Sequence, residues 1–422
     1  MSHTTRFCNR ALLALAVCVA LVATGLDAQP VLTGGLDTPF KLARTPGGNF
    51  LVAESGTGAG DGRVSLLSRF GARFTVLAGL PSAITPEGGA LGPTAVADAH
   101  RTLYVVIGEG DALGASPPPT QVPNPDGISS PIFSSVLRAR FDPVPDGIRE
   151  GLELSAADVQ ALADGHEVVL ENDSGERVEL LLLADFRDLA PDPFLSVRQS
   201  NPFAAVWAGS LTAADLAELG FAAPSLAAAN FFARLNPETP VGRRLAERSR
   251  VYVVDAGMNT VVEVHAATGR WRVLTRIPPQ PNPLFPALGG PVSDAVPTGA
   301  HLRADGDLLV TTLPGFPFAA GAAKVFRIDR QTGAFAPHVE GLTSAIEVIE
   351  VGGATYVLEV STDLLGGAPG RLVRLASPGA APEVVAAPLI GPTGMVYDPL
   401  GDQIVVTETF TGLVRRIPLG GG

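Results

Sequence analysis

Three short strands separated by turns follow one another in Gly394-Met395-Val396-Tyr397, Ile404-Val405-Val406-Thr407-Glu408 and Gly412-Leu413-Val414-Arg415-Arg416-Ile417. A fourth strand of this unit is missing from the C-terminal end of the chain. Pro30-Val31-Leu32-Thr33, near the other end, has the residues to supply it. A ring of repeated units closed by its own two ends is a β-propeller, in which no sheet edge stays open.

The rest of the chain repeats the same unit. The second strand of the unit is β-branched and recurs at 50–54, 103–107, 251–255, 308–312, 355–359 and 404–408. A first strand, often opened by Pro, precedes each copy at 39–43, 93–97, 202–206, 297–301, 344–348 and 392–396. Third and fourth strands follow in each unit. We therefore predict an all-β fold, a six-bladed β-propeller, with seven blades as the alternative if residues 142–177 conceal another blade.

Two segments interrupt the repeat, at about 142–177 and 210–248. Ser155-Ala156-Ala157-Asp158 and Thr212-Ala213-Ala214-Asp215 are typical of helix starts, so we expect two partly helical insertions. Both join strands whose hairpins emerge on one face of a propeller, so they should share that face and pack together. The longer Pro- and Gly-rich loops at 108–134, 281–295, 313–322 and 361–369 should rim the opposite face.

The N-terminus has the order of a secretory signal peptide. Arg6 and Arg10 precede an apolar stretch from Ala11 to Leu26, and Ala28 offers a cleavage site. We predict a signal peptide over 1–28 and one propeller domain over 29–422, secreted or periplasmic, with no integral membrane segment in the mature chain. Cys18 suggests a lipoprotein as a weaker alternative, because Val17 fits poorly before a lipidated Cys.

Composition limits the partners. The formal net charge is −12, and it becomes −13 without residues 1–28, so nucleic acid is excluded as a partner. Both cysteines lie within residues 1–28, which leaves the mature chain without a thiol or a disulfide. We expect a monomer that binds a small molecule or a protein.

Four acidic residues end the second strand in equivalent positions of four units: Glu54, Asp255, Glu359 and Glu408. One hypothesis is that they accept hydrogen bonds from backbone N–H groups of the next turn and are structural. The other is that they converge near the axis and bind a ligand or a metal, Ca²⁺ or another divalent cation, through oxygen atoms.

Lys41 is one of two lysines and falls on the innermost strand, where Ala95, Ala204, Gly299, Ile346 and Gly394 fill the same column. It is a further candidate ligand-binding residue, and pairing with Glu54 or Glu408 is the alternative. His301 ends the same strand in the fourth unit and is more typical of a structural histidine. No Gly-x-Ser-x-Gly, His-Glu-x-x-His or Gly-x-x-x-x-Gly-Lys motif is present, so no catalytic residues are assigned.

Several motifs resemble those of one family: Gly35-Leu36-Asp37-Thr38-Pro39, Val52-Ala53-Glu54-Ser55-Gly56-Thr57-Gly58, Leu91-Gly92-Pro93-Thr94, Tyr104-Val105-Val106-Ile107-Gly108, Ser200-Asn201-Pro202-Phe203, Val253-Val254-Asp255-Ala256-Gly257-Met258-Asn259-Thr260 and Tyr356-Val357-Leu358-Glu359. Together they resemble the ScyD/ScyE family over about residues 30–418. The resemblance implies an exported propeller similar to NHL-repeat domains, from a family named after cyanobacterial scytonemin biosynthesis. It carries over no catalytic residue, and the two insertions depart from the shorter blades that it implies.

A more distant likeness is to gluconolactonase-type propellers, which hold a metal through Glu, Asn and Asp. Glu54 compares with their Glu, but no Asn matches in the right strand position. Three functions follow as hypotheses. The first is a non-enzymatic exported binding or scaffold propeller, and the second a metal-dependent lactonase or hydrolase. The third is a protein-interaction module that uses the insertion face.

Overall fold

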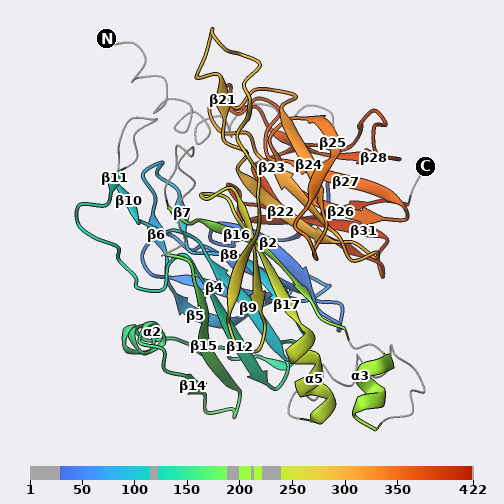
Figure 1. The fold of residues 1–422 in the computed structure, drawn as a ribbon. Coiled ribbons are helices and arrows are strands. Elements are labelled where there is room, and N and C mark those ends of the chain that lie inside the picture. Colours follow the sequence, from blue (N-terminus) through green and yellow to red (C-terminus); the bar gives the residue numbers. More distant parts are fainter. Residues whose placement is uncertain (1–28, 115–121, 188–198, 211–212, 221–238, 421–422) are drawn as a thin grey trace.

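The computed structural model of the chain describes residues 29–114, 122–187, 199–210, 213–220 and 239–420. The predicted signal peptide, 1–28, lies outside these residues. Six sheets, antiparallel except for one short added strand, radiate from a common axis as the blades of a β-propeller (Figure 1). The six-bladed prediction is confirmed.

The first two blades carry an extra strand at their outer edge. Blade 1 contains β2 (Pro39–Arg44), β3 (Phe50–Glu54), β4 (Gly62–Leu67) and β5 (Arg73–Leu80), and blade 2 contains β8 (Pro93–Asp98), β9 (Thr102–Ile107), β12 (Ser135–Asp142) and β15 (Arg177–Asp185). The extra strands are β13 (Leu152–Glu153) on blade 1 and β14 (Val168–Glu171) on blade 2.

Blades 3 to 5 have the four strands of the repeat. Blade 3 contains β16 (Pro202–Ala208), β17 (Arg250–Asp255), β18 (Thr260–His265) and β19 (Trp271–Arg276), and blade 4 contains β22 (Pro297–Leu302), β23 (Leu308–Thr312), β24 (Ala323–Ile328) and β25 (Phe335–Leu342). Blade 5 contains β26 (Ala345–Val351), β27 (Ala354–Glu359), β28 (Gly370–Leu375) and β29 (Glu383–Leu389).

Both ends of the described chain build blade 6, as the sequence predicts. Its strands are β30 (Pro392–Asp398), β31 (Gln403–Glu408), β32 (Leu413–Pro418) and the N-terminal β1 (Val31–Thr33). β1 pairs antiparallel with β32, with Val31 opposite Arg415, and the Arg416 N–H donates to the Pro30 carbonyl at 2.8 Å. The N-terminal strand therefore closes the ring.

The core is divided among the blade interfaces. Six hydrophobic clusters each join side chains of two neighbouring blades, and one of them joins blade 6 to blade 1 through Val405, Val414, Phe50 and Val52. Apolar side chains on both faces of the second strands account for this, because each blade packs against a neighbour on either side. The ring is thus held together at every interface, the closing one included.

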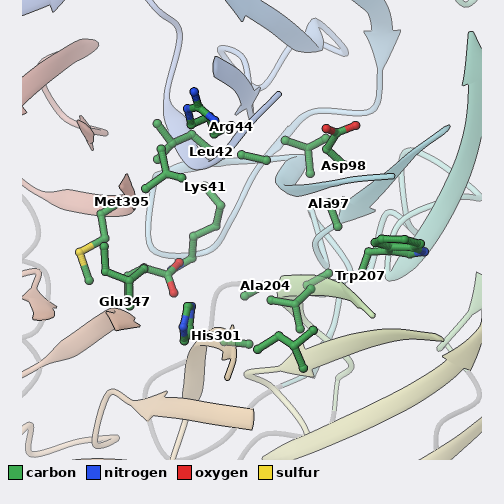
Figure 2. A pocket seen from close by; sticks show the side chains of 18 residues that line it. Lys41, Leu42, Arg44, Ala97, Asp98, Ala204, Trp207, His301, Glu347 and Met395 are labelled. Atoms are coloured by element: carbon green, nitrogen blue, oxygen red, sulfur yellow. The ribbon is translucent and has the colours of Figure 1, made fainter. Parts of the chain in front are cut away.

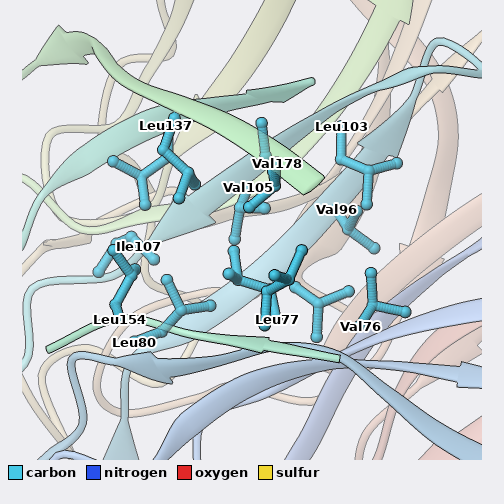
Figure 3. Close-up of a cluster of buried hydrophobic side chains, with 14 of the residues drawn as sticks. Val76, Leu77, Leu80, Val96, Leu103, Val105, Ile107, Leu137, Leu154 and Val178 are labelled. Atoms are coloured by element: carbon cyan, nitrogen blue, oxygen red, sulfur yellow. The ribbon is translucent and has the colours of Figure 1, made fainter. Parts of the chain in front are cut away.

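The insertion after β12 thickens two blades and does not form a seventh. It contains a 3₁₀ turn, η2 (Pro145–Gly147), the strands β13 and β14, and helix α2 (Ala156–Ala163) between them. β13 adds to β5 of blade 1 and β14 to β15 of blade 2. Leu154 and Leu162 belong to the cluster between these blades, together with Leu77 and Val105. Figure 3 shows Leu154 within this cluster. The seven-blade alternative is therefore wrong.

The second insertion contains α3 (Ala213–Glu218) and α5 (Pro240–Arg248). Its apolar residues Leu216, Val241 and Leu245 form a small cluster against Trp207 of β16. Figure 1 shows α2, α3 and α5 at the same face of the propeller, which we call the insertion face. The described parts of the two insertions contribute to separate hydrophobic clusters. Residues 221–238 of the second insertion lie outside the described residues, so the packing of the two insertions against each other stays a prediction.

The opposite face, here the loop face, carries the long connections, as the sequence predicts. Small two-stranded hairpins form there: β6 (Ala83–Ile84) with β7 (Ala90–Leu91), β10 (Leu113–Gly114) with β11 (Val122–Pro123), and β20 (Gln280–Pro281) with β21 (Val292–Ser293). Figure 1 shows β10, β11 and β21 at the end away from the helices. Among the described helices, none has the length and apolar character needed to cross a membrane.

Candidate functional site in the central channel

The innermost strands of all six blades share one register. The first residue of each pairs with the last residue of the second strand, as in Pro39 with Glu54, and an irregularity in the pairing follows at once. In blade 5 this first residue is Ala345, opposite Glu359. The sequence repeat predicts Ser344 as the first residue of this strand, so the predicted match of its residues to those of the other innermost strands is wrong by one position. The residue equivalent to Lys41 is Glu347, not Ile346.

This correction reveals an ion pair that the sequence analysis missed. Lys41 Nζ of blade 1 lies 3.0 Å from Glu347 Oε2 of blade 5, and it also donates to the Ile346 carbonyl at 2.6 Å. Figure 2 shows the Lys41 side chain extending towards the Glu347 carboxylate. Both residues are buried, at 4% and 7% exposure. The predicted partners of Lys41, Glu54 and Glu408, bind other groups.

Burial acts against both charges of this pair. Loss of solvent lowers the pKa of Lys41, and the Glu347 carboxylate counteracts this effect. Loss of solvent likewise raises the pKa of Glu347, against the opposing influence of Lys41 and backbone N–H donors. Each partner therefore offsets the desolvation cost of the other, and neither charge is well accommodated alone.

Two glycines make room for the pair. A Cβ atom on Gly299 of β22 would lie 2.6 Å from Glu347 Oε1, and one on Gly394 of β30 would lie 2.8 Å from the Lys41 Cα. Both glycines occupy the same column as the pair, so their lack of a side chain lets the long Lys and Glu side chains cross the channel. The small residues that the sequence places in this column thus have a specific role.

Two aromatic side chains lie beside the pair, one residue nearer the loop face on their strands. The rings of Phe40 and Phe203 meet edge to face with centroids 5.4 Å apart, and Lys41 Nζ lies 5.4 Å from the centroid of Phe203. These phenylalanines come from blades 1 and 3, directly after the first residues of β2 and β16. Together with the ion pair they form a floor across the channel.

Above this floor, towards the insertion face, the channel widens into a cavity of about 320 Å³. All six innermost strands line it, and Ala97, Ala204, Ala300, Ile349 and Met395 are among its apolar lining residues, while polar and apolar atoms contribute about equally to its surface. Trp207 adds an aromatic side chain where β16 leads into the second insertion. This volume lies at the lower end of the range found for small-molecule sites.

Polar groups stand at a few points of the wall. Arg44 Nε lies 3.4 Å from Asp398 Oδ1, and Asp98 lines the cavity near it. His301 Nε2 accepts the Glu350 N–H at 3.4 Å. Burial, with a smaller contribution from Arg303, lowers the pKa of His301 to about 4. His301 is therefore a neutral hydrogen-bond acceptor that lies in the channel wall, which agrees with a structural histidine.

The carboxylates of Glu54 and Glu408 are buried and fully engaged within their own blades. Glu54 accepts the Asp37 N–H at 2.8 Å and pairs with Arg73 at 2.9 Å. Glu408 accepts the Ile390 N–H at 2.8 Å and pairs with Arg415 at 2.8 Å. In each case the N–H belongs to the turn that leads into the same blade.

Asp255 and Glu359 follow the same arrangement. Asp255 accepts the Asn201 N–H at 3.0 Å, the Met258 N–H at 2.9 Å and the Ser200 hydroxyl at 2.5 Å. Burial raises the pKa of Asp255 despite these donors. Glu359 accepts the Thr343 N–H at 2.5 Å and pairs with Arg371. The four acids thus tie each blade to the turn that enters it.

This geometry bears directly on metal binding. No group of three or more His, Cys, Asp and Glu side chains suited to hold a metal occurs among the residues that the structure describes. The acidic residues at the strand ends use their oxygen atoms on N–H groups, hydroxyls and arginines, so the Ca²⁺ hypothesis gains no support there. Of the five predicted site residues, only Lys41 lines the cavity.

Comparison with known proteins assigns no family to this chain. No family model matches the sequence, and no curated protein matches it. Among solved structures, a gluconolactonase from Xanthomonas campestris is 9% identical with a TM-score of 0.46, covering 96% of this chain and 99% of the other. The PQQ-bound aldose sugar dehydrogenase from Streptomyces coelicolor is 12% identical with a TM-score of 0.42, and the match covers 92% of this chain and 99% of the dehydrogenase. A streptogramin B lyase is 10% identical with a TM-score of 0.40, covering 93% and 94%.

Proposed function

We propose that this protein is an exported, non-enzymatic propeller of the ScyD/ScyE type that binds a small molecule in its central cavity. The observation that carries the proposal is the cavity itself, which is about 320 Å³, lies on the propeller axis and is lined by all six blades. Ligand sites of propellers and barrels commonly lie at such mouths, where many elements each contribute one side chain. Space for roughly ten water molecules is available there.

The lining indicates the chemistry of the ligand. Its walls combine aliphatic side chains with a few polar groups, while its floor holds the Lys41 ammonium group beside Glu347. A Lys ammonium has three N–H donors, and the contacts of Lys41 to Glu347 and to the Ile346 carbonyl involve two acceptors. A compact, uncharged ligand with an apolar body and one hydroxyl or carbonyl oxygen directed at Lys41 fits this arrangement.

Trp207 supplies the readout for a test. The chain has two tryptophans, so Trp271→Phe leaves Trp207 at the cavity as the sole one. In this background we expect neutral cyclic alcohols such as menthol to shift the Trp207 emission in a saturable way. Ala300→Phe, which fills part of the cavity, should abolish the shift.

Ala336→Phe is the matched control, because Ala336 lies exposed on the outer strand β25. It should leave the titration unchanged. If Ala300→Phe folds normally and still gives the full shift, or if no neutral alcohol or ketone in a fragment set shifts the emission, the cavity is not the binding site.

The metal-dependent lactonase hypothesis finds less support. Such chemistry needs oxygen or nitrogen donors that converge on an ion. Two cations that line the cavity, Lys41 and Arg44, are instead each paired with a carboxylate, that of Glu347 and that of Asp398. The protein-interaction hypothesis keeps one supporting feature, since the second insertion stands beside the cavity mouth through Trp207.

A further inference from the structure

An exposed apolar loop stands on the loop face, far from the cavity mouth. It runs from Pro283 to Val292, between blades 3 and 4, with the sequence Pro-Leu-Phe-Pro-Ala-Leu-Gly-Gly-Pro-Val. All ten residues are exposed and none has a polar or charged side chain. Figure 1 shows the loop projecting beyond the blades near β21. We call residues 283–292 the apolar lobe.

The large side chains of the lobe face solvent. Leu284 is 41% exposed, Phe285 51%, Leu288 39% and Val292 52%. Phe316, from the neighbouring loop of blade 4, is 43% exposed. Soluble proteins rarely expose contiguous apolar side chains in this number without a partner for them.

Part of the backbone of the lobe is hydrogen-bonded internally. The side chain of Asn282, which is buried, donates to the carbonyls of Leu288 and Gly290 at 2.7 Å and accepts the Leu284 N–H at 2.9 Å. The Leu288 N–H donates to the Leu284 carbonyl at 3.0 Å. Pro283, Pro286 and Pro291 have no N–H to satisfy.

Internal hydrogen bonds of the backbone favour entry into a lipid layer. Entry into a hydrocarbon layer is costly for every unbonded N–H and carbonyl, whereas water satisfies them without help. A loop that only needs to be soluble gains nothing from an all-apolar surface. Together, these features fit a loop that enters the interface of a lipid layer.

Other loops of the same face extend the apolar surface. Ile84, Val122, Leu365 and Phe410 are exposed at connections of blades 1, 2, 5 and 6. All of these connections emerge on the loop face, because they join blades or join second to third strands. A broad, flat partner could contact several of them together, which a narrow protein pocket could not.

Charge selects the kind of lipid. Glu87, Asp126 and Asp363 are exposed on connections of this face, and the chain carries a net charge of −12. An anionic lipid surface would repel such a face. We propose that the loop face docks on a zwitterionic lipid surface, with the apolar lobe entering the interface between headgroups and acyl chains.

Vesicle flotation tests this docking. The purified protein is mixed with phosphatidylcholine vesicles, and in parallel with vesicles that also contain phosphatidylglycerol. We expect it to float with the phosphatidylcholine vesicles and less with the anionic ones. The double variant Phe285→Asp, Leu288→Asp should lower the partition coefficient about tenfold, since two large apolar side chains no longer enter the lipid.

Phe70→Asp is the matched control, since Phe70 is 81% exposed on a hairpin of blade 1 that emerges on the insertion face. It should float like the unmodified protein, and all three proteins share the same N-terminal segment. Equal thermal unfolding midpoints would exclude misfolding as the cause of lost binding.

Three results would overturn the proposal. The first is an unmodified protein that stays unbound to phosphatidylcholine, and the second a double variant that floats as well as the unmodified protein. The third is that light scattering shows self-association of the unmodified protein and not of the double variant, while neither protein binds vesicles. The lobe would then contact a second copy of the chain instead of a lipid.

Discussion

Lys41 and Glu347 meet across the channel at 3.0 Å, although they belong to blades 1 and 5 and are separated by most of the chain. Their contact is available only in the closed ring, where it bridges two blades that share no interface. Both side chains are buried, so the pair combines a large desolvation cost with a strong mutual attraction. It is the ion pair on the channel axis.

Replacing one partner of this pair should therefore destabilise the protein more than replacing both. We expect Lys41→Met and Glu347→Gln each to lower the free energy of unfolding, the former by about 3 to 5 kcal/mol because it leaves a buried carboxylate unpaired. The combined variant should recover much of this loss. Denaturant unfolding of the four proteins measures the coupling, and additive losses would contradict it.

Stability should also depend on pH through His301. Its pKa is about 4 in the folded state and about 6.5 when unfolded, so the unfolded state binds more protons between these values. Above pH 6.5 this contribution is fully present, and it is lost as the pH falls towards 4. The loss lowers the free energy of unfolding by about 3 kcal/mol near pH 4.

The variant His301→Gln isolates this contribution, since its amide oxygen can still accept the Glu350 N–H. The difference in unfolding free energy between the variant and the unmodified protein should shrink from pH 7 to pH 4. A constant difference over this range would show that His301 titrates alike in both states.

The acidic residues at the strand ends should stabilise the fold without a metal. Glu408→Gln weakens the contact to Arg415 and should lower the free energy of unfolding by about 1 to 3 kcal/mol. Treatment with EDTA should leave the melting temperature of the unmodified protein unchanged. If EDTA lowers the melting temperature of the unmodified protein but not that of the Glu408→Gln variant, Glu408 instead holds a metal.

Closure by β1 gives a fourth prediction. Deleting residues 29–35 removes the strand that pairs with β32 and takes Leu32 out of the cluster between blades 6 and 1. The whole domain should melt at lower temperature in one transition. Appending the same residues after a short glycine-rich turn at the C-terminus should restore much of the loss, whereas an unchanged melting temperature on deletion would contradict a closing role.

The sequence predicts the blades well because each strand has its own local signals. Alternating β-branched residues, opening prolines and tight turns mark almost every strand, and the pairing of both chain ends follows from the incomplete last unit. The strand at Ala345 is the instructive exception, since it lacks the opening Pro. Ser344, with a positive φ of 50°, is equivalent to Thr38 and Val296, but nothing local announces this conformation.

The shift of one residue in β26 is the reason that the sequence does not predict the ion pair. With Ser344 as the first residue, Glu347 falls one position after the residue that matches Lys41, so no contact between the two is expected. The acidic residues at the strand ends were found, yet whether they converge or bind within their own blades depends on arginines such as Arg73 and Arg415, which lie on other strands. The cavity likewise results from how six strands pack, which no single segment encodes.

The pairing of β1 with β32 also sets when this protein can fold. The two strands stand at opposite ends of the described chain, so all five other blades are synthesised before β32 can pair with β1. Blade 6 therefore cannot be completed until β32 has been made, and closing the ring comes after the other blades have become available to fold.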